Sequence, residues 1–122
     1  MERTRFIEHR GHPILLLDYN GITDPDEALQ EIAKSQAFVA TQPPSSLLTL
    51  TQVHGARYNR EIVGAMKELA AHNKPYVRAG AVVGLSPLHR IVYTAVMKFS
   101  GRNLPAFDDA EQAKDYLVEQ AR

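Results

Sequence analysis

Imidazole, guanidinium and hydroxyl side chains follow two of the apolar runs in this sequence, at points where strands are expected to end. One group is His54, Gly55 and Arg57, and the other is Ser86, His89 and Arg90. Because the carboxyl ends of parallel strands meet at one edge of a sheet, where open α/β folds bind ligands, these residues should lie together. The helices that follow would add free backbone amides and partial positive charge. The pattern predicts a site for a small anionic ligand or an acidic protein partner.

A structural interpretation of the same residues stays open. Ser86 precedes Pro87, and a capping serine followed by a proline at the first helical position is a common way to begin a helix. Arg57, His89 and Arg90 are also typical of a solvated surface. Capping alone is therefore enough to explain Ser86.

Catalysis is a third interpretation. A serine nucleophile would need Ser86 with His54 as its base and Asp18 as the orienting carboxylate. The chain lacks the Gly-x-Ser-x-Gly elbow, and Pro87 has no amide to serve as an oxyanion donor. We therefore expect a non-enzymatic protein with no catalytic residues.

Metal and cofactor sites are not expected either. The sequence has five histidines, which are His9, His12, His54, His72 and His89. The first two flank a turn without a third ligand at metal-binding spacing, and the others fall on separate predicted elements. A Gly-x-x-x-x-Gly-Lys phosphate loop is absent, and Gly80 and Gly84 do not fit a dinucleotide fingerprint.

The segment that begins at Ser86 carries an unusually broad apolar face. Its main stripe runs from Leu88 to Phe99 at helical spacing, and Tyr93 and Met97 form a second row beside it. Such a face is typical of a core or a dimer contact, with a ligand groove as the less common alternative. We expect Tyr93 and Met97 to be hidden in a homodimer or against the final helix.

Two hydrophobic periods alternate along the chain. They predict strands at 3–9, 14–19, 46–51, 76–83 and 106–107, and helices at about 25–40, 59–72, 87–100 and from 109 onward. The first two strands form a hairpin, while helices separate the others, which implies parallel pairing through right-handed crossovers. The predicted fold class is α/β, a mixed sheet with an antiparallel first strand, the remaining strands parallel, and four helices.

Individual residues can be assigned within these elements. Asp24 and Asp108 are expected to cap the first and last helices. The first helix should bury three apolar residues, Leu29, Ile32 and Ala33. The strand at 76–83, rich in small and β-branched residues, should be central in the sheet.

Composition bounds the class of protein. The 122 residues suffice for a single domain, 1–122, that buries about two-thirds of its unfolded surface. Fourteen Lys and Arg balance fourteen Asp and Glu, so no broad positive field favours nucleic acid. The absence of cysteine and of any apolar run near about 20 residues favours a soluble cytoplasmic protein without a membrane-spanning segment.

Four stretches form a pattern that covers nearly the whole chain. They are RFIEHRG at 5–11, LLTLT at 47–51 with GAR at 55–57, AHNKPYV at 71–77, and FSGR at 99–102 leading to FD at 107–108. This pattern resembles the SpoIIAA-like family, small bacterial relatives of STAS domains, with residues 72–75 and 99–102 as its most specific part. The resemblance implies a STAS-like fold, which is related to the lipid-binding CRAL-TRIO fold. It implies no reaction.

The resemblance also indicates where a phosphorylation switch would lie. In the STAS proteins that antagonise anti-sigma factors, a serine at the start of the helix after the third strand is phosphorylated. The corresponding loop here, 51–59, has no serine; Thr51 is its only hydroxyl at the strand end, and Tyr58 is of a different class. Gln52 and His54 also stand where many relatives have Asp and Thr. No residue is therefore assigned to such a switch.

Two functions of different class follow from these observations. The first is a non-enzymatic STAS-like module that recognises a protein partner or a small anionic ligand at the strand carboxyl edge. The second is a carrier of an apolar small molecule or lipid, suggested by the fold relationship and by Tyr93, Met97 and Phe99. An uncharacterised enzyme is the third. A carrier should copurify with its cargo, whereas a partner module should not.

Overall fold

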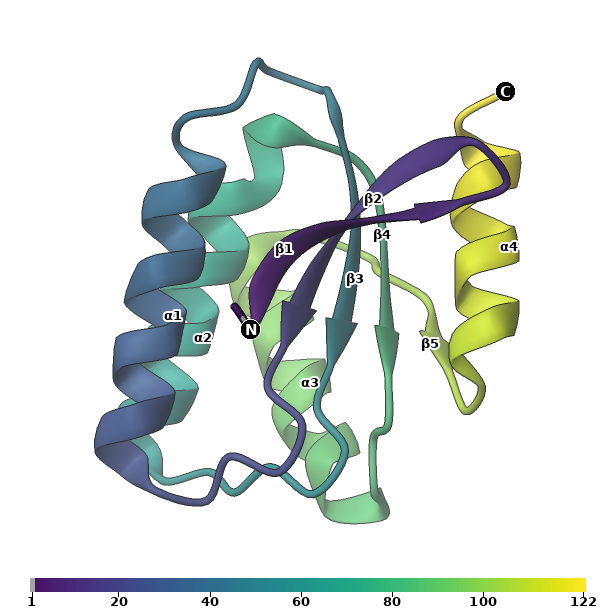
Figure 1. Ribbon diagram of the computed structural model, residues 1–122. Helices are drawn as coiled ribbons and strands as arrows, with labels where there is room; N and C mark the ends of the chain where they lie inside the picture. The colour runs from purple at the N-terminus through teal and green to yellow at the C-terminus, as the bar shows by residue number, and fades with distance from the viewer. Residues whose placement is uncertain (1) are drawn as a thin grey trace.

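The alternating hydrophobic periods form a five-stranded sheet with helices on both faces, as the computed structural model shows for residues 2–122 (Figure 1). The strands are β1 (Thr4–His9), β2 (His12–Asp18), β3 (Leu47–Gln52), β4 (Val77–Val83) and β5 (Ala106–Phe107). The helices are α1 (Pro25–Val39), α2 (Arg60–Asn73), α3 (Pro87–Ser100) and α4 (Ala110–Gln120), with a short 3₁₀ helix at Lys74–Tyr76. The predicted α/β class, with four helices and a mixed sheet, is confirmed.

The sheet runs in the order β1-β2-β3-β4-β5, so each strand lies beside its neighbour in sequence. Strands β1 and β2 pair antiparallel, from Thr4 opposite Leu17 to His9 opposite His12, and every later pair is parallel. The central strand is β3, not β4 as predicted. Strand β4 pairs with β5 only through Val82 and Val83, because β5 has only two residues.

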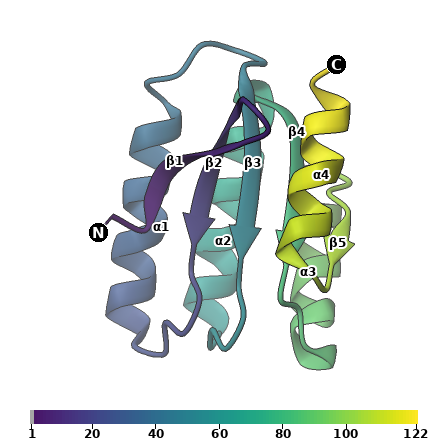
Figure 2. The ribbon, with the colours of Figure 1, turned by 45° about the vertical axis from the view of Figure 1, so that its right-hand side comes forward.

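Three helices cover one face of the sheet and one helix covers the other. Helices α1, α2 and α3 lie side by side on the first face, and α4 lies alone on the second (Figures 1 and 2). Residues 14–17 of β2 and 47–50 of β3 are therefore buried on both faces, and seven of these eight residues are apolar. Two separate hydrophobic clusters result, one on each side of the sheet.

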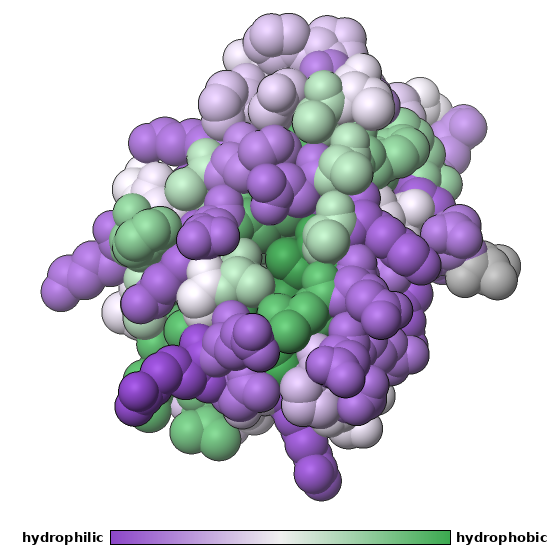
Figure 3. Space-filling view, turned by 90° about the vertical axis from the view of Figure 1, so that its left-hand side faces the viewer, coloured by the Kyte–Doolittle hydropathy of each residue, from purple (hydrophilic) through white to green (hydrophobic). Residues whose placement is uncertain are grey.

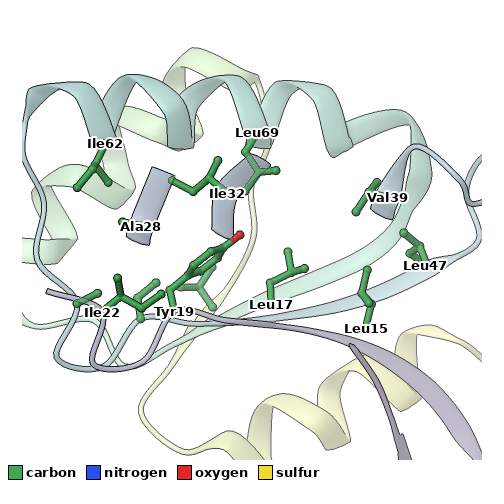
Figure 4. Packing of buried hydrophobic residues seen from close by; sticks show 13 residues of the cluster. Leu15, Leu17, Tyr19, Ile22, Ala28, Ile32, Val39, Leu47, Ile62 and Leu69 are labelled. Atoms are coloured by element: carbon green, nitrogen blue, oxygen red, sulfur yellow. The ribbon is translucent and has the colours of Figure 1, made fainter. Parts of the chain in front are cut away.

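The larger cluster joins α1 and α2 to the sheet. Figure 4 shows Leu17 and Tyr19 beneath Ile32 and Leu69, all of which are buried. Ala33, predicted to be buried, is exposed, and Leu29 is half-buried. Two polar residues of α1, Glu31 and Ser35, are buried in this half of the helix layer.

Capping side chains begin the helices much as the sequence predicts. Asp24 accepts a hydrogen bond from the Glu27 amide at 3.0 Å, at the start of α1. The cap of α4 is Asp109, which accepts from the Glu111 amide at 2.9 Å, and not Asp108 as predicted. Asp108 follows β5 directly, so the chain needs one more extended residue before α4 can begin.

Apolar surface remains accessible on the side of the molecule formed by α1 and α2. Figure 3, seen from the side of α1 and α2, shows a hollow with hydrophobic side chains at its bottom and hydrophilic side chains around it.

Within residues 2–122, none of the helices has the length and apolar character needed to cross a bilayer.

Candidate functional site

The predicted edge residues do come together, with one exception. His54, Gly55, Arg57, Ser86 and His89 line an open hollow at the carboxyl edge of β3 and β4, together with Ala56, Gly84, Leu85 and Asp108. Arg90, the sixth predicted residue, is exposed on α3 and does not belong to this lining. We refer to these nine lining residues as the edge hollow.

The loops after β3 and β4 build the edge hollow, and a third loop, at Asn20 and Gly21, holds the first of them in place. The His54 amide donates to Asn20 Oδ1 at 2.8 Å, and the His54 carbonyl accepts from the Gly21 amide at 2.8 Å. Gly84 has a φ of +95°, and a Cβ at this position would lie 2.8 Å from the His54 nitrogen. A side chain at residue 84 would therefore push the two loops apart.

The charges in the edge hollow are mixed. Exposed Arg57 lines it, but so does Asp108, whose carboxylate the short strand β5 brings to this edge. Ser86 Oγ already accepts the His89 amide at 3.1 Å, and Pro87 has no amide to offer. An anion would meet a carboxylate and few free donors here, so the geometry suits it less well than the sequence predicts.

His89 connects the edge hollow to the interior of the molecule. It is only 8% exposed, and its ring contacts the Tyr58 ring edge to face, with centroids 4.8 Å apart. Its buried Nδ1 has no hydrogen-bond partner. Buried polar atoms without a partner are rare in folded proteins, and each one points to a missing ligand, a missing water or a functional role.

Behind His89 lies a cavity of about 80 Å³, which we call the α2–α3 cavity. It is partly open and lies between two helices and the sheet. Its apolar walls include Met66, Leu69 and Ala70 from α2, Val92, Tyr93, Val96 and Met97 from α3, and Leu17 and Val82 from the sheet. The polar residues that reach it are Thr49, Thr51, Tyr58, Asn73, His89 and Arg102.

Arg102, Tyr58 and Tyr93 are the groups of this wall whose pKa is displaced by burial, and burial raises the pKa of the Tyr93 hydroxyl. Burial lowers the pKa of the Arg102 guanidinium to about 10, so it remains positively charged at neutral pH. Burial raises the pKa of the Tyr58 hydroxyl to about 12, so it stays neutral. Within residues 2–122, no carboxylate forms an ion pair with Arg102, whose Nη1 instead donates to the Ala70 carbonyl at 3.3 Å.

The three apolar residues singled out from α3 divide between its two sides. Tyr93 and Met97 face inward and line the cavity, where the Tyr93 hydroxyl donates to the Leu104 carbonyl and Met97 Sδ accepts the Leu104 amide at 3.3 Å. Phe99 lies on the outer side and is 59% exposed. The two inward residues therefore belong to a cavity wall.

The expectation that the final helix covers the apolar face of α3 is wrong, because α3 packs against α2 while α4 lies on the opposite face of the sheet (Figure 2). The Leu88 to Phe99 stripe belongs only in part to the core: Val96 is buried, whereas Leu88 is 70% exposed and Ile91 is 69% exposed. The helix has apolar residues on two sides, and periodicity alone does not tell which side faces the sheet.

Arg102 is the site residue that sequence reasoning missed as a functional group. The only signal was its place directly after the helix-ending Gly101 and before an apolar strand, where a cation has no evident solvent-exposed role. The sequence pattern assigns no role to Tyr58, because its hydroxyl is of a different class from the serine phosphorylated in STAS proteins. Both residues reach the cavity because loops bring them back over the sheet.

The histidines do not gather into a metal centre in the described part of the chain. Among residues 2–122, no group of three or more histidine or acidic side chains could hold a metal ion. His9 instead bonds Asp115 on α4 at 2.7 Å.

Comparison of the chain with protein-family models, with curated proteins and with solved structures found no match. What can be said of its function therefore rests on the α/β fold, the edge hollow and the α2–α3 cavity.

Proposed function

We propose that this protein is a STAS-like, non-enzymatic binding module that holds a small, largely apolar molecule in the α2–α3 cavity. The observation that carries the proposal is an apolar cavity lined by two polar residues whose chemistry is not satisfied by the described chain: buried His89, whose Nδ1 has no hydrogen-bond partner, and half-buried Arg102, whose charge has no carboxylate partner. Protein interiors are close-packed and their polar groups are paired, so such a combination favours a ligand site over a packing defect. The single antiparallel strand β1 at the sheet edge agrees with the layout that the SpoIIAA-like resemblance implies.

The walls select an apolar occupant. The cavity of about 80 Å³ has room for roughly five to eight water-sized spheres, but its surface offers few polar atoms to hold water. Burial of hydrocarbon there is favourable by about 25 cal/mol for each Å² removed from water. Because the cavity is partly open, a ligand longer than the cavity can extend beyond it.

The same wall argues for binding without catalysis. His89 Nδ1 has no carboxylate or other partner to orient the ring, whereas catalytic histidines are held in place by a third group. Tyr58 contacts His89 ring to ring and not through a hydrogen bond to Nδ1. The residues at the cavity therefore provide a receptor for a ligand but no oriented acid or base.

A matched pair of variants on α2 tests the proposal. Ala70 lines the cavity and Ala71, the next residue, is exposed, so Ala70→Leu fills the cavity while Ala71→Leu adds the same atoms to the surface. Native mass spectrometry of gently purified protein should find a small-molecule mass on the wild type and on Ala71→Leu, and not on Ala70→Leu. Val92→Phe is a second cavity-filling variant with a half-buried site, in case Ala70→Leu does not fold.

Binding of a fluorescent apolar probe is a second measurement. The probe should bind to the wild type and to Ala71→Leu, but only weakly to Ala70→Leu. Equal probe binding by all three folded proteins would show that the apolar molecule binds elsewhere.

An acidic protein partner on the outer side of α3 is the second candidate. Leu88, Ile91 and Phe99 are exposed there, α3 contains no acidic residue, and Arg90 and Lys98 are exposed beside them. The Nζ of Lys67 also lies 5.8 Å from the centre of the Phe99 ring. Two copies of this face in antiparallel contact would bring Arg90 near Lys98, so the charges favour an acidic surface over a homodimer.

Sedimentation velocity separates these partners. The wild type alone should sediment as a monomer, which excludes the homodimer. The double variant Arg90→Ala, Lys98→Ala should keep its stability within about 0.5 kcal/mol, as surface substitutions usually do, while it weakens the binding of an acidic amphipathic helical peptide. Peptide binding that does not change with salt or with this double variant would contradict the second candidate.

A further inference from the structure

Arg102 brings a positive charge into the α2–α3 cavity. Its backbone follows Gly101, the residue that ends α3, and its amide donates to the Met97 carbonyl at 3.2 Å. Its side chain returns between α2 and the sheet, where Nη1 reaches the Ala70 carbonyl at 3.3 Å. A guanidinium has five N–H donors, so most of its hydrogen-bonding capacity remains beyond this one contact.

An uncompensated buried charge is costly, and buried charges in proteins are normally paired. No carboxylate among residues 2–122 is placed to pair with Arg102. The lowered pKa of Arg102 reflects burial alone, without a neighbouring charge among its causes. The group that would balance this charge is therefore not supplied by the described chain.

Gly80 allows close packing beside the guanidinium. A Cβ at this position on β4 would lie 2.7 Å from Thr49 Oγ1, 2.9 Å from Leu104 Cδ2 and 3.6 Å from Arg102 Nη2. A side chain at residue 80 would therefore collide with Thr49 and Leu104. The glycine lets the Thr49 hydroxyl and the Arg102 guanidinium lie near one another at the cavity wall, which both residues line.

We propose that the ligand of this cavity carries a carboxylate, which pairs with the Arg102 guanidinium beside the Thr49 hydroxyl while its hydrocarbon part lies against α3. This inference rests on the proposed function and specifies its ligand class. A carboxylate is favoured over a phosphate because one guanidinium matches its single charge and its planar pair of oxygens. The cavity of about 80 Å³ also leaves little room for a phosphate and an apolar group together.

Hexanoate and hexan-1-ol are suitable probes, because they differ in the charged group but share a short hydrocarbon chain. Isothermal titration calorimetry of the wild type at neutral pH should show hexanoate binding at least about tenfold more tightly, the gain expected of a charge-assisted hydrogen bond. Arg102→Met should remove this preference, because hexanoate should lose at least about tenfold more affinity than hexan-1-ol does. Arg90→Met, which removes an equal charge from the exposed side of α3, should preserve the preference.

Arg102→Met should fold, since it replaces a buried charge by an apolar chain of similar length. If it does not, Arg102→Lys keeps the charge without the planar fork and should retain part of the preference. The comparison of the two probes on the wild type needs no variant.

Equal affinity of the wild type for both probes would overturn the carboxylate assignment and leave cavity binding intact. An equal loss of both probes in Arg102→Met would also overturn it, since Arg102 would then support the fold of the cavity only. If neither probe binds the wild type, the carboxylate assignment fails, and the Ala70→Leu and Ala71→Leu pair decides independently whether the cavity binds any apolar molecule.

Discussion

The two ends of the three-helix layer treat buried polar groups in opposite ways. Beneath α1, the Thr4 hydroxyl donates to Glu31 at 2.8 Å and lies 2.8 Å from Ser35 Oγ, which also accepts the Tyr19 hydroxyl at 2.7 Å. These four side chains are at most 9% exposed, and each has a partner.

Beneath α3, by contrast, His89 Nδ1 has no hydrogen-bond partner, the Arg102 guanidinium makes one hydrogen bond with its five donors, and a cavity remains. The same sheet face thus has a closed half and an open half. A paired polar cluster stabilises a unique packing, whereas unpaired groups around a cavity are costly unless something binds there. The difference indicates that the α1 half serves the fold and that the α3 half is the place to look for function.

Core truncation should separate the two halves most strongly. Ile32→Ala removes a fully packed side chain beneath α1 and should lower the free energy of unfolding by about 3 kcal/mol. Met97→Ala, at the wall of the existing cavity, should lower it by less than half as much, because fewer contacts are lost. Urea denaturation measures both values. Equal losses would mean that the α3 half is packed as tightly as the α1 half.

Replacing a buried polar side chain should lower the free energy of unfolding beneath α1 but not beneath α3. Ser35→Ala leaves the buried Tyr19 hydroxyl without its acceptor and should cost about 2 kcal/mol. His89→Leu removes a buried nitrogen that has no partner, so stability should change by less than about 0.5 kcal/mol or rise. A large loss in His89→Leu, measured by the same denaturation, would show that the histidine is structural.

Helix capping should not distinguish the halves. Asp24 and Ser86 each accept a first-turn amide, at 3.0 Å and 3.1 Å respectively. Asp24→Ala and Ser86→Ala should therefore each cost about 1 kcal/mol. If Ser86→Ala alone leaves the free energy of unfolding unchanged in chemical denaturation, something other than its cap holds the start of α3. The two halves would then differ in helix capping as well as in packing.

The smallest effect on stability is expected on the face of the sheet covered by α4, which serves as a reference for the two halves of the other face. The hydrogen bond from His9, supported by nearby Arg10, lowers the pKa of the Asp115 carboxyl below its ordinary value of 3.8. A carboxyl with a lowered folded pKa adds stability above its unfolded pKa and loses that contribution as pH falls through the folded value.

Asp115→Asn should therefore lower Tm slightly at about pH 6, and its difference from the wild type should shrink to nothing near about pH 2. Glu8→Gln, which changes an exposed carboxylate on β1 next to His9, is the control and should show a flatter difference. A Tm difference for Asp115→Asn that is constant with pH would mean that the His9 contact does not depend on the carboxylate charge.

Much of the architecture follows from the sequence alone. The order of strands and helices, the hairpin of the first two strands and the parallel pairing of the rest were predictable, because periodicity and crossover handedness are local or nearly local properties. The caps Asp24 and Ser86 were predictable for the same reason, since a cap acts on amides two or three residues away. The predicted topology also places His54 and Ser86 at one edge of the sheet, where the structure has them.

Only the tertiary structure decided which polar groups meet and which face of α3 is covered. That helix has apolar residues on both sides, so packing against α2 selects the side with Tyr93 and Met97 and leaves Leu88 exposed. Arg102 lies far in sequence from Thr49, and a return of the chain over the sheet brings both to one cavity. Local sequence patterns carry no record of such contacts, because burial depends on where distant segments leave space once the layers have closed.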